Sequence, residues 1–199
     1  MPKIIRLAPE TLSAAAEEIT AALRIPGSVA LVPTETVYGL ICRAGDQAAC
    51  SRIFSLKGRA GSKLLGWFIR DEEMAKKHGI ILNSLSSALI KKYTPGALTI
   101  ISRKDDGTTQ GFRIPDHPLL LDILKRLGEP LVQTSANASG MADAESTEDA
   151  LSQLNGDVDI AVDGGTLAPG SMGSTVVDAT GDELKVLRQG KLAIPVPFK

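Results

Sequence analysis

The chain has 199 residues, of which 43% are hydrophobic and 23% charged, and its formal net charge is −1 at pH 7. This composition excludes a disordered chain and a disulfide scaffold, and it predicts one packed domain over residues 1–199. Because the net charge is close to zero, any anion site must be a local cluster of cations rather than a property of the whole surface.

The hydrophobic segments are short, and none approaches the roughly 20 apolar residues that cross a bilayer. The N-terminus does not resemble a signal peptide. Two cysteines, Cys42 and Cys50, and two histidines occur without a CxxC motif. These features predict a cytoplasmic protein that has no membrane association and no structural zinc site, with both cysteines packed as small hydrophobes.

Apolar periodicity and capping residues predict the elements of the N-terminal half. Leu12, Ile19 and Leu23, for example, share one face of a helix. In chain order the expected elements are a helix over 10–24, a strand over 28–32, a helix from Asp46 to Lys57, a strand over 64–69, and two short helices capped by Asp71 and Ser84.

The C-terminal half continues this alternation, and Ser146 with Asp149 resembles a capping box. Because strands and helices alternate without a repeat, we expect an α/β or α+β fold with a mixed sheet flanked by helices. The expected elements are strands over 98–102 and 112–114, a helix over 118–128, a strand over 131–134, a helix from Ser146 to Leu154, and strands over 158–162, 174–178 and 184–188.

Three polar segments follow predicted strands or helices: residues 33–40 (PTETVYGL), Lys57-Gly58-Arg59 with Lys63, and residues 134–140 (TSANASG). Each has an ordinary structural interpretation by itself. A basic pair complements the C-terminus of a helix, and Ser, Asn and Gly are common turn residues. None of the three segments is decisive alone.

The segments together have the composition of a nucleotide site, which needs fixed cations for phosphates and short polar donors on a backbone that a ligand can approach. Neither GxxxxGK[ST] nor GxGxxG occurs, so the phosphate cradle must be of another type. The candidate cations are Lys57, Arg59, Lys63, Arg113 and Arg188, and the candidate short donors are Ser135, Asn137, Ser174 and Thr175.

Seven blocks extend this pattern over nearly the whole chain, from about residue 28 to residue 190, with residues 191–199 as a C-terminal tail. They are PTETVYGL, LKGR, TPGALT, FRIPDHP, TSANASG, GSTVVD and LRQG. Their order and spacing resemble the YrdC-like domain family, which includes TsaC-type L-threonylcarbamoyladenylate synthases. The resemblance implies a twisted mixed sheet around a basic cavity that binds ATP, L-threonine, bicarbonate and Mg²⁺.

The resemblance also implies roles for individual residues. Thr36, Arg113 and Ser174 would bind threonine, with Arg113 on its carboxylate. Lys57 and Arg59 would act in catalysis. The implied ATP-binding residues are Lys57, Arg59, Lys63, Thr109, Ser135, Asn137 and Arg188.

The implied reaction forms threonylcarbamoyl-AMP and pyrophosphate, and the product serves threonylcarbamoyladenosine modification of tRNA through downstream transfer proteins. Every reactant is or becomes anionic, so charge neutralisation and alignment, with Mg²⁺ on the pyrophosphate, would supply catalysis. Glu35 and Asp116 are further candidates for proton transfer or metal binding. His78 and His117 do not form a convincing Ser-His-Asp arrangement.

Some positions depart from the family pattern. Ala60 and Leu64 stand where many members have proline, and Phe68 stands where some have histidine. One alternative is a noncatalytic module that binds RNA or nucleotide in the same basic cavity. A second is a carbamoyl-transfer enzyme, against which the lack of zinc-finger or acylphosphatase-like segments argues.

Overall fold

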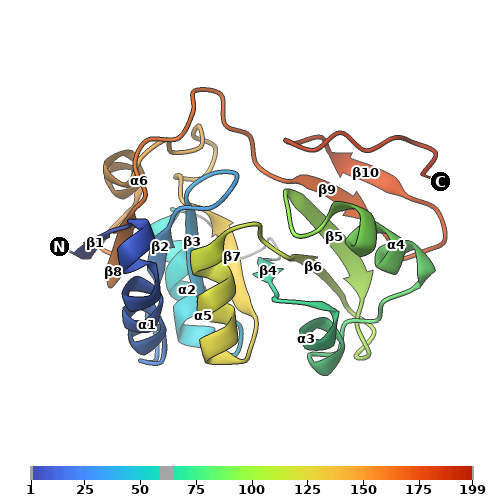
Figure 1. Ribbon diagram of the computed structural model, residues 1–199, viewed down its shortest axis with the longest axis horizontal. Helices are drawn as coiled ribbons and strands as arrows, with labels where there is room; N and C mark the ends of the chain where they lie inside the picture. The colour runs from blue at the N-terminus through green and yellow to red at the C-terminus, as the bar shows by residue number, and fades with distance from the viewer. Residues whose placement is uncertain (1, 59–64, 199) are drawn as a thin grey trace.

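The computed structural model describes residues 2–58 and 65–198. Within these residues one sheet runs in the order β1-β8-β2-β3-β7-β4-β6-β5-β9-β10 (Figure 1). Its strands are β1 (Lys3–Arg6), β2 (Ala30–Val32), β3 (Gly39–Arg43), β4 (Gly66–Phe68), β5 (Leu98–Arg103), β6 (Thr109–Arg113), β7 (Leu131–Ser135), β8 (Ile160–Asp163), β9 (Thr175–Asp178) and β10 (Lys185–Arg188).

The sheet is mixed, as the sequence predicted. Its parallel pairs are β1–β8, β2–β8, β4–β6 and β5–β9, and its antiparallel pairs are β2–β3, β3–β7, β4–β7, β5–β6 and β9–β10. The strands β1 and β3 were not among the predicted elements. β1 pairs only with β8, whose residues lie far along the chain, so no local pattern marks it.

The helices begin close to the predicted caps. Asp46, Asp71 and Ser146 each accept a backbone N–H three residues on, as predicted. The cap assigned to Ser84 was wrong, because the side chain of Asn83 accepts from the amide of Ser86 and Ser84 is the first helical residue. The helices are η1 (Pro9–Thr11), α1 (Leu12–Leu23), α2 (Gln47–Leu56), α3 (Glu72–Lys77), α4 (Ser84–Tyr93), α5 (Pro118–Leu127) and α6 (Thr147–Gln153).

None of these helices has the length and apolar character needed to span a bilayer. The capping box proposed at the start of α6 is only half formed. Ser146 caps the amide of Asp149, but the Asp149 carboxylate accepts from the amide of Glu145 rather than from that of Ser146.

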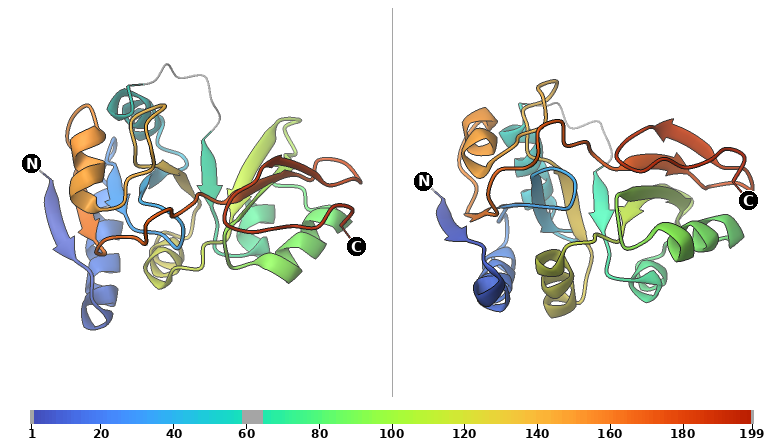
Figure 2. Two further views of the ribbon diagram at one scale, coloured as in Figure 1. Left: turned by 90° about the horizontal axis from the view of Figure 1, so that it is seen from above. Right: turned by 45° about the horizontal axis from the view of Figure 1, so that its top comes forward.

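Alternating strand residues contribute to two hydrophobic cores on opposite faces of the sheet. Figure 2 shows α1 and α5 on one side of the sheet and α2 and α6 on the other. Ala30 and Val32 of β2 pack with α1 and α5, whereas Leu31 packs with α2 and α6. The second core has no buried described member on β5, β6 or β9. That half of the sheet is therefore covered by helices on one face, and its other face is available for a site.

A long segment from β8 to β9 crosses from one half of the sheet to the other (Figure 1). Tyr38, which is fully buried, anchors the start of this segment. Its hydroxyl donates to the carbonyl of Gly165 at 2.7 Å and accepts from the amide of Gly164 at 3.0 Å. The crossover is thereby fixed to the polar segment 33–40.

Candidate active site

A cavity of about 300 Å³ lies on the uncovered face, at the junction of the two halves of the sheet. This volume is at the lower end of the range for small-molecule sites. The cavity brings together most of the described residues that the sequence singled out. Those on its lining are Thr36, Thr109, Arg113, Ser135, Ser174 and Arg188.

Glycines on the central strands open the floor of this cavity. A Cβ atom at Gly66 of β4 would lie 2.6 Å from Nε2 of Gln133, and one at Gly111 of β6 would meet the side chains of Thr99 and Ile101 at 3.6 and 3.7 Å. The contact at Gly66 is a close approach, whereas those at Gly111 are ordinary contact distances. An isolated glycine in a strand often marks a close approach, so the signal at Gly66 was present in the sequence and was missed.

Arg113 and Thr36 are joined by a directed chain of hydrogen bonds. Nη1 of Arg113 donates to Oγ1 of Thr36 at 3.0 Å, and the Thr36 and Thr34 hydroxyls lie 2.9 Å apart. Thr34 Oγ1 donates to the carbonyl of Val37 at 2.7 Å. Since a hydroxyl has one hydrogen, Thr36 must be the donor to Thr34, and it is left to accept from Arg113.

The guanidinium of Arg113 is nearly buried, at 3% exposed. Its Cζ lies 4.7 Å from the ring centroid of Phe68, a favourable cation–π arrangement. Phe68 thus packs against Arg113 and is not part of the described cavity lining. Nη2 faces the Glu35 carboxylate at 3.6 Å, and Nε has no hydrogen-bond partner among the described residues.

Burial lowers the pKa of Arg113; Glu35 opposes this shift and Arg188 adds to it. The group stays cationic at neutral pH because its ordinary pKa is so high. One edge of a buried cation, formed by Nε and Nη2, is therefore not hydrogen-bonded to described residues. The anion that already faces this edge is the Glu35 carboxylate, both of whose oxygens are buried and have no hydrogen-bond partner among the described residues.

Ser135 and Asn137 bond to each other and to Lys57. Ser135 Oγ donates to Asn137 Oδ1 at 2.5 Å, and Lys57 Nζ donates to the carbonyls of Ser135 and Asn137 at 2.5 and 2.6 Å. Ser135 lines the cavity, while Lys57 and Asn137 lie behind it. Both supporting residues are buried, at 4% and 8% exposed.

Arg188 and Ser174 line another side of the cavity and contact each other. Nη2 of Arg188 donates to the Ser174 carbonyl at 2.8 Å, and the Ser174 hydroxyl lies 2.7 Å from that of Thr99. Thr99 belongs to the TPGALT block but was not named as a site residue. Asp143 and Gln133 also line the cavity, and no local pattern in the sequence distinguishes them.

The remaining candidates are not part of the described cavity lining. Arg59 and Lys63, with the departures Ala60 and Leu64, fall outside the described residues. His117 occupies the N-cap of α5 without a capping bond from its side chain, and burial lowers its pKa. Neither His117 nor His78 is part of the described cavity lining. Glu35 contacts Arg113 from outside that lining.

The two cysteines pack in the core around α2. Their sulfur atoms lie 3.8 Å apart, with Cys42 on β3 fully buried and Cys50 partly exposed. Burial raises the pKa of both thiols. Thiols with a raised pKa are poor nucleophiles, which agrees with their interpretation as small hydrophobes.

The sequence model of the Sua5/YciO/YrdC family, described as telomere recombination, matches residues 23–190. The chain belongs to this family. The resemblance identified from the seven blocks is thereby confirmed. The matched range contains every candidate residue of the cavity.

Curated members of the Sua5/YciO/YrdC family are similar over most of the chain. Threonylcarbamoyl-AMP synthase from Mus musculus is 33% identical over 183 residues, which cover 85% of this chain and 62% of the mouse protein. The Bacillus subtilis protein of the same name is 34% identical over 180 residues, covering 85% of this chain and 52% of that protein. The chain therefore spans less than two thirds of the length of these relatives.

Solved structures of the family have the same fold. Sua5 of P. abyssi complexed with L-threonine superimposes with a TM-score of 0.82 at 28% identity, over 98% of this chain and 58% of that chain. YciO of E. coli superimposes with a TM-score of 0.81 at 25% identity, over 100% of both chains. The expected architecture of a mixed sheet with flanking helices is confirmed.

Proposed function

We propose that this protein is an L-threonylcarbamoyladenylate synthase, which forms threonylcarbamoyl-AMP and pyrophosphate from L-threonine, bicarbonate and ATP. The product would supply threonylcarbamoyl groups to the proteins that modify adenosine in tRNA. Support comes from the names of the Mus musculus and Bacillus subtilis relatives and from the L-threonine bound to P. abyssi Sua5.

The observation that carries the proposal is the orientation of Arg113. Thr36 holds its Nη1, and the Nε and Nη2 edge has no hydrogen bond to described residues. This edge presents two parallel N–H groups, the geometry that fits a carboxylate. We assign it to the carboxylate of threonine, which would take the place of Glu35 at Nη2.

The adenylate would lie against the other walls, where Ser135, Thr109 and Arg188 line the cavity. Mg²⁺ would enter bound to the ATP phosphates, as part of the substrate. No group of three or more metal-ligating side chains occurs within residues 2–58 and 65–198. Asp143 lines the cavity, and one carboxylate together with phosphate oxygens is a usual environment for this ion.

The reaction needs alignment more than a protein nucleophile. The threonine nitrogen bonds to the carbon of CO₂ derived from bicarbonate and loses a proton, which gives a carbamate. A carbamate oxygen then bonds to the α-phosphorus of ATP as the bond from this phosphorus to the bridging oxygen of the β-phosphate breaks. Pyrophosphate leaves, and the cations of the site would stabilise the charge that develops.

Pyrophosphate release tests this assignment. We expect release only when ATP, threonine and bicarbonate are present together. Release from ATP alone would contradict the synthase assignment. Nucleotide binding without release under any condition would instead favour the noncatalytic nucleotide- or RNA-binding alternative.

A further inference from the structure

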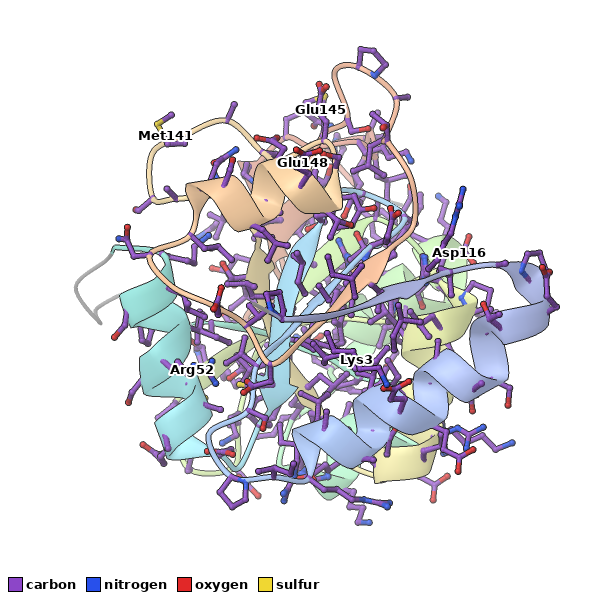
Figure 3. The ribbon with its side chains drawn as sticks, turned by 90° about the vertical axis from the view of Figure 1, so that its left-hand side faces the viewer. Lys3, Arg52, Asp116, Met141, Glu145 and Glu148 are labelled. Carbon is purple, nitrogen blue, oxygen red and sulfur yellow. The ribbon has the colours of Figure 1, made fainter. Side chains whose placement is uncertain are left out.

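Lys57 lies directly after α2, and its ammonium is directed into the loop that follows β7. Besides the two carbonyls of Ser135 and Asn137, Nζ contacts Asn137 Oδ1 at 3.3 Å. An ammonium carries three hydrogens, so Nζ can donate to all three of these acceptors at once. In Figure 3 Met141 marks this loop ahead of α6, and Arg52 marks α2.

The backbone of Lys57 makes a further bond to the same loop. Its carbonyl, at the C-terminal end of α2, accepts from the amide of Ser139 at 3.0 Å. Asn137 then completes the loop, because its Nδ2 donates to the carbonyl of Met141 at 2.6 Å. Lys57 therefore contacts the segment 135–141 through both its side chain and its main chain.

We propose that Lys57 is a positioning residue, which holds the segment 135–141 in the conformation that presents Ser135 to the nucleotide, rather than a direct ligand of the triphosphate. This inference rests on the proposed function. The family resemblance implied a triphosphate contact for Lys57, but the acceptors described around Nζ are atoms of this loop. Lys57 itself is 4% exposed and lies outside the described cavity lining.

The two roles predict different effects of a Lys57 substitution on nucleotide affinity. If Lys57 is a phosphate ligand, the substitution weakens ATP binding and leaves adenosine binding unchanged, because adenosine has no phosphate. A residue that positions the loop affects both ligands by a similar factor. The two roles also predict different results for Lys57→Arg. An arginine readily replaces lysine as a phosphate ligand, but it is too large to fit where the carbonyls of Ser135 and Asn137 lie only 2.5 and 2.6 Å from Nζ.

The experiment compares Lys57→Met, Lys57→Gln and Lys57→Arg with Lys125→Met, a control at an exposed lysine in the last turn of α5. Calorimetry measures the affinities for ATP and adenosine, and amide hydrogen exchange reports on the loop without any ligand. We expect Lys57→Met and Lys57→Arg to lose about tenfold or more in both affinities. The amides of Ser139 and Met141 should exchange about tenfold or more faster, with those of β3 unchanged.

Lys57→Gln retains one donor and should give an intermediate exchange rate if Lys57→Met does not fold. Loss of ATP affinity with unchanged adenosine affinity in Lys57→Met would overturn the positioning role. Parent-like affinities for both ligands in Lys57→Arg would also overturn it. Unchanged exchange at Ser139 would do the same. The exchange result does not depend on catalysis, so failure of this inference is distinguishable from failure of the proposed synthase activity.

Discussion

Arg113 donates a hydrogen bond of 3.0 Å to the hydroxyl of Thr36, although 77 positions separate the two residues in the chain. The bond joins the end of β6 to the loop between β2 and β3. It fixes one nitrogen of a buried guanidinium. The other edge of the group is thereby oriented before any ligand binds, which reduces the entropy lost on binding.

Thr36→Val should misorient Arg113, because valine has the shape of threonine but cannot accept the Nη1 hydrogen. We expect the KM for threonine to rise about tenfold, and the KM for ATP to change by less than about threefold. Pyrophosphate release measured against each substrate gives both values. Thr36→Ser keeps the hydroxyl and should behave nearly as the parent protein, and an equal defect in the two variants would refute the orienting role.

Arg113→Lys should damage threonine use far more than ATP binding, since a lysine offers a point charge in place of two parallel donors. The expected loss in kcat/KM for threonine is about 2 kcal/mol or more. A competition assay with threonine, serine and other small amino acids measures the selectivity. Equal turnover of all these amino acids, unaffected by the substitution, would show that the carboxylate partner lies elsewhere.

Gly111→Val should fill the cavity without unfolding the protein. Its Cβ would meet Thr99 and Ile101 at ordinary contact distances, and its side chain would occupy space on the floor of the site. We expect ATP affinity, measured by calorimetry, to fall about tenfold, and the free energy of unfolding to change by less than about 1 kcal/mol.

Gly181→Val is the matched control, because nothing lies within 4 Å of a Cβ at Gly181 and this glycine is outside the described lining. It should leave ATP affinity unchanged. A similar loss of affinity in both variants would indicate a general effect of replacing glycine rather than a filled cavity.

Asp46 should make the protein sensitive to acid. Hydrogen bonds from backbone amides, that of Ala49 first, lower the pKa of the Asp46 carboxyl in the folded protein. The ionised carboxylate therefore stabilises the fold fully above its pKa in the unfolded chain, about 3.9, and this stabilisation is lost as the pH falls through the lower pKa of the folded protein. Asp46→Ala should cost about 1 kcal/mol of unfolding free energy at pH 7. The difference from the parent protein should shrink below about pH 4. Urea unfolding at several pH values checks this, and a difference independent of pH would contradict it.

Local signals in the sequence predicted the elements well, because a cap depends on residues only three positions apart. Asp46, Asp71 and Ser146 are examples. The order of the strands depends instead on partners far along the chain, as in the pairing of Lys3 with Ile160, and the sequence pattern carried no information on it.

The candidate site was predictable as a set of residues but not as an arrangement. The family resemblance implied Thr36 and Arg113 as separate contacts, yet their mutual hydrogen bond follows only from the folded chain. It also grouped Lys57 with the candidate phosphate ligands. A cation after a helix does not reveal whether its ammonium turns outward or into a neighbouring loop, so the contacts of Nζ with Ser135 and Asn137 follow only from the folded chain. Gln133 and Asp143 reach the cavity through tertiary structure alone.

The mass of the nucleotide product distinguishes the proposed synthase from a protein that only binds or hydrolyses ATP. The protein is incubated with ATP, threonine and ¹³C-bicarbonate, and the nucleotides are analysed by mass spectrometry. We expect a product with the mass of AMP joined to threonine and one labelled carbon, whose yield falls sharply in Arg113→Lys. AMP without the label, or a labelled product formed equally by Arg113→Lys, would overturn the synthase assignment and the role of Arg113.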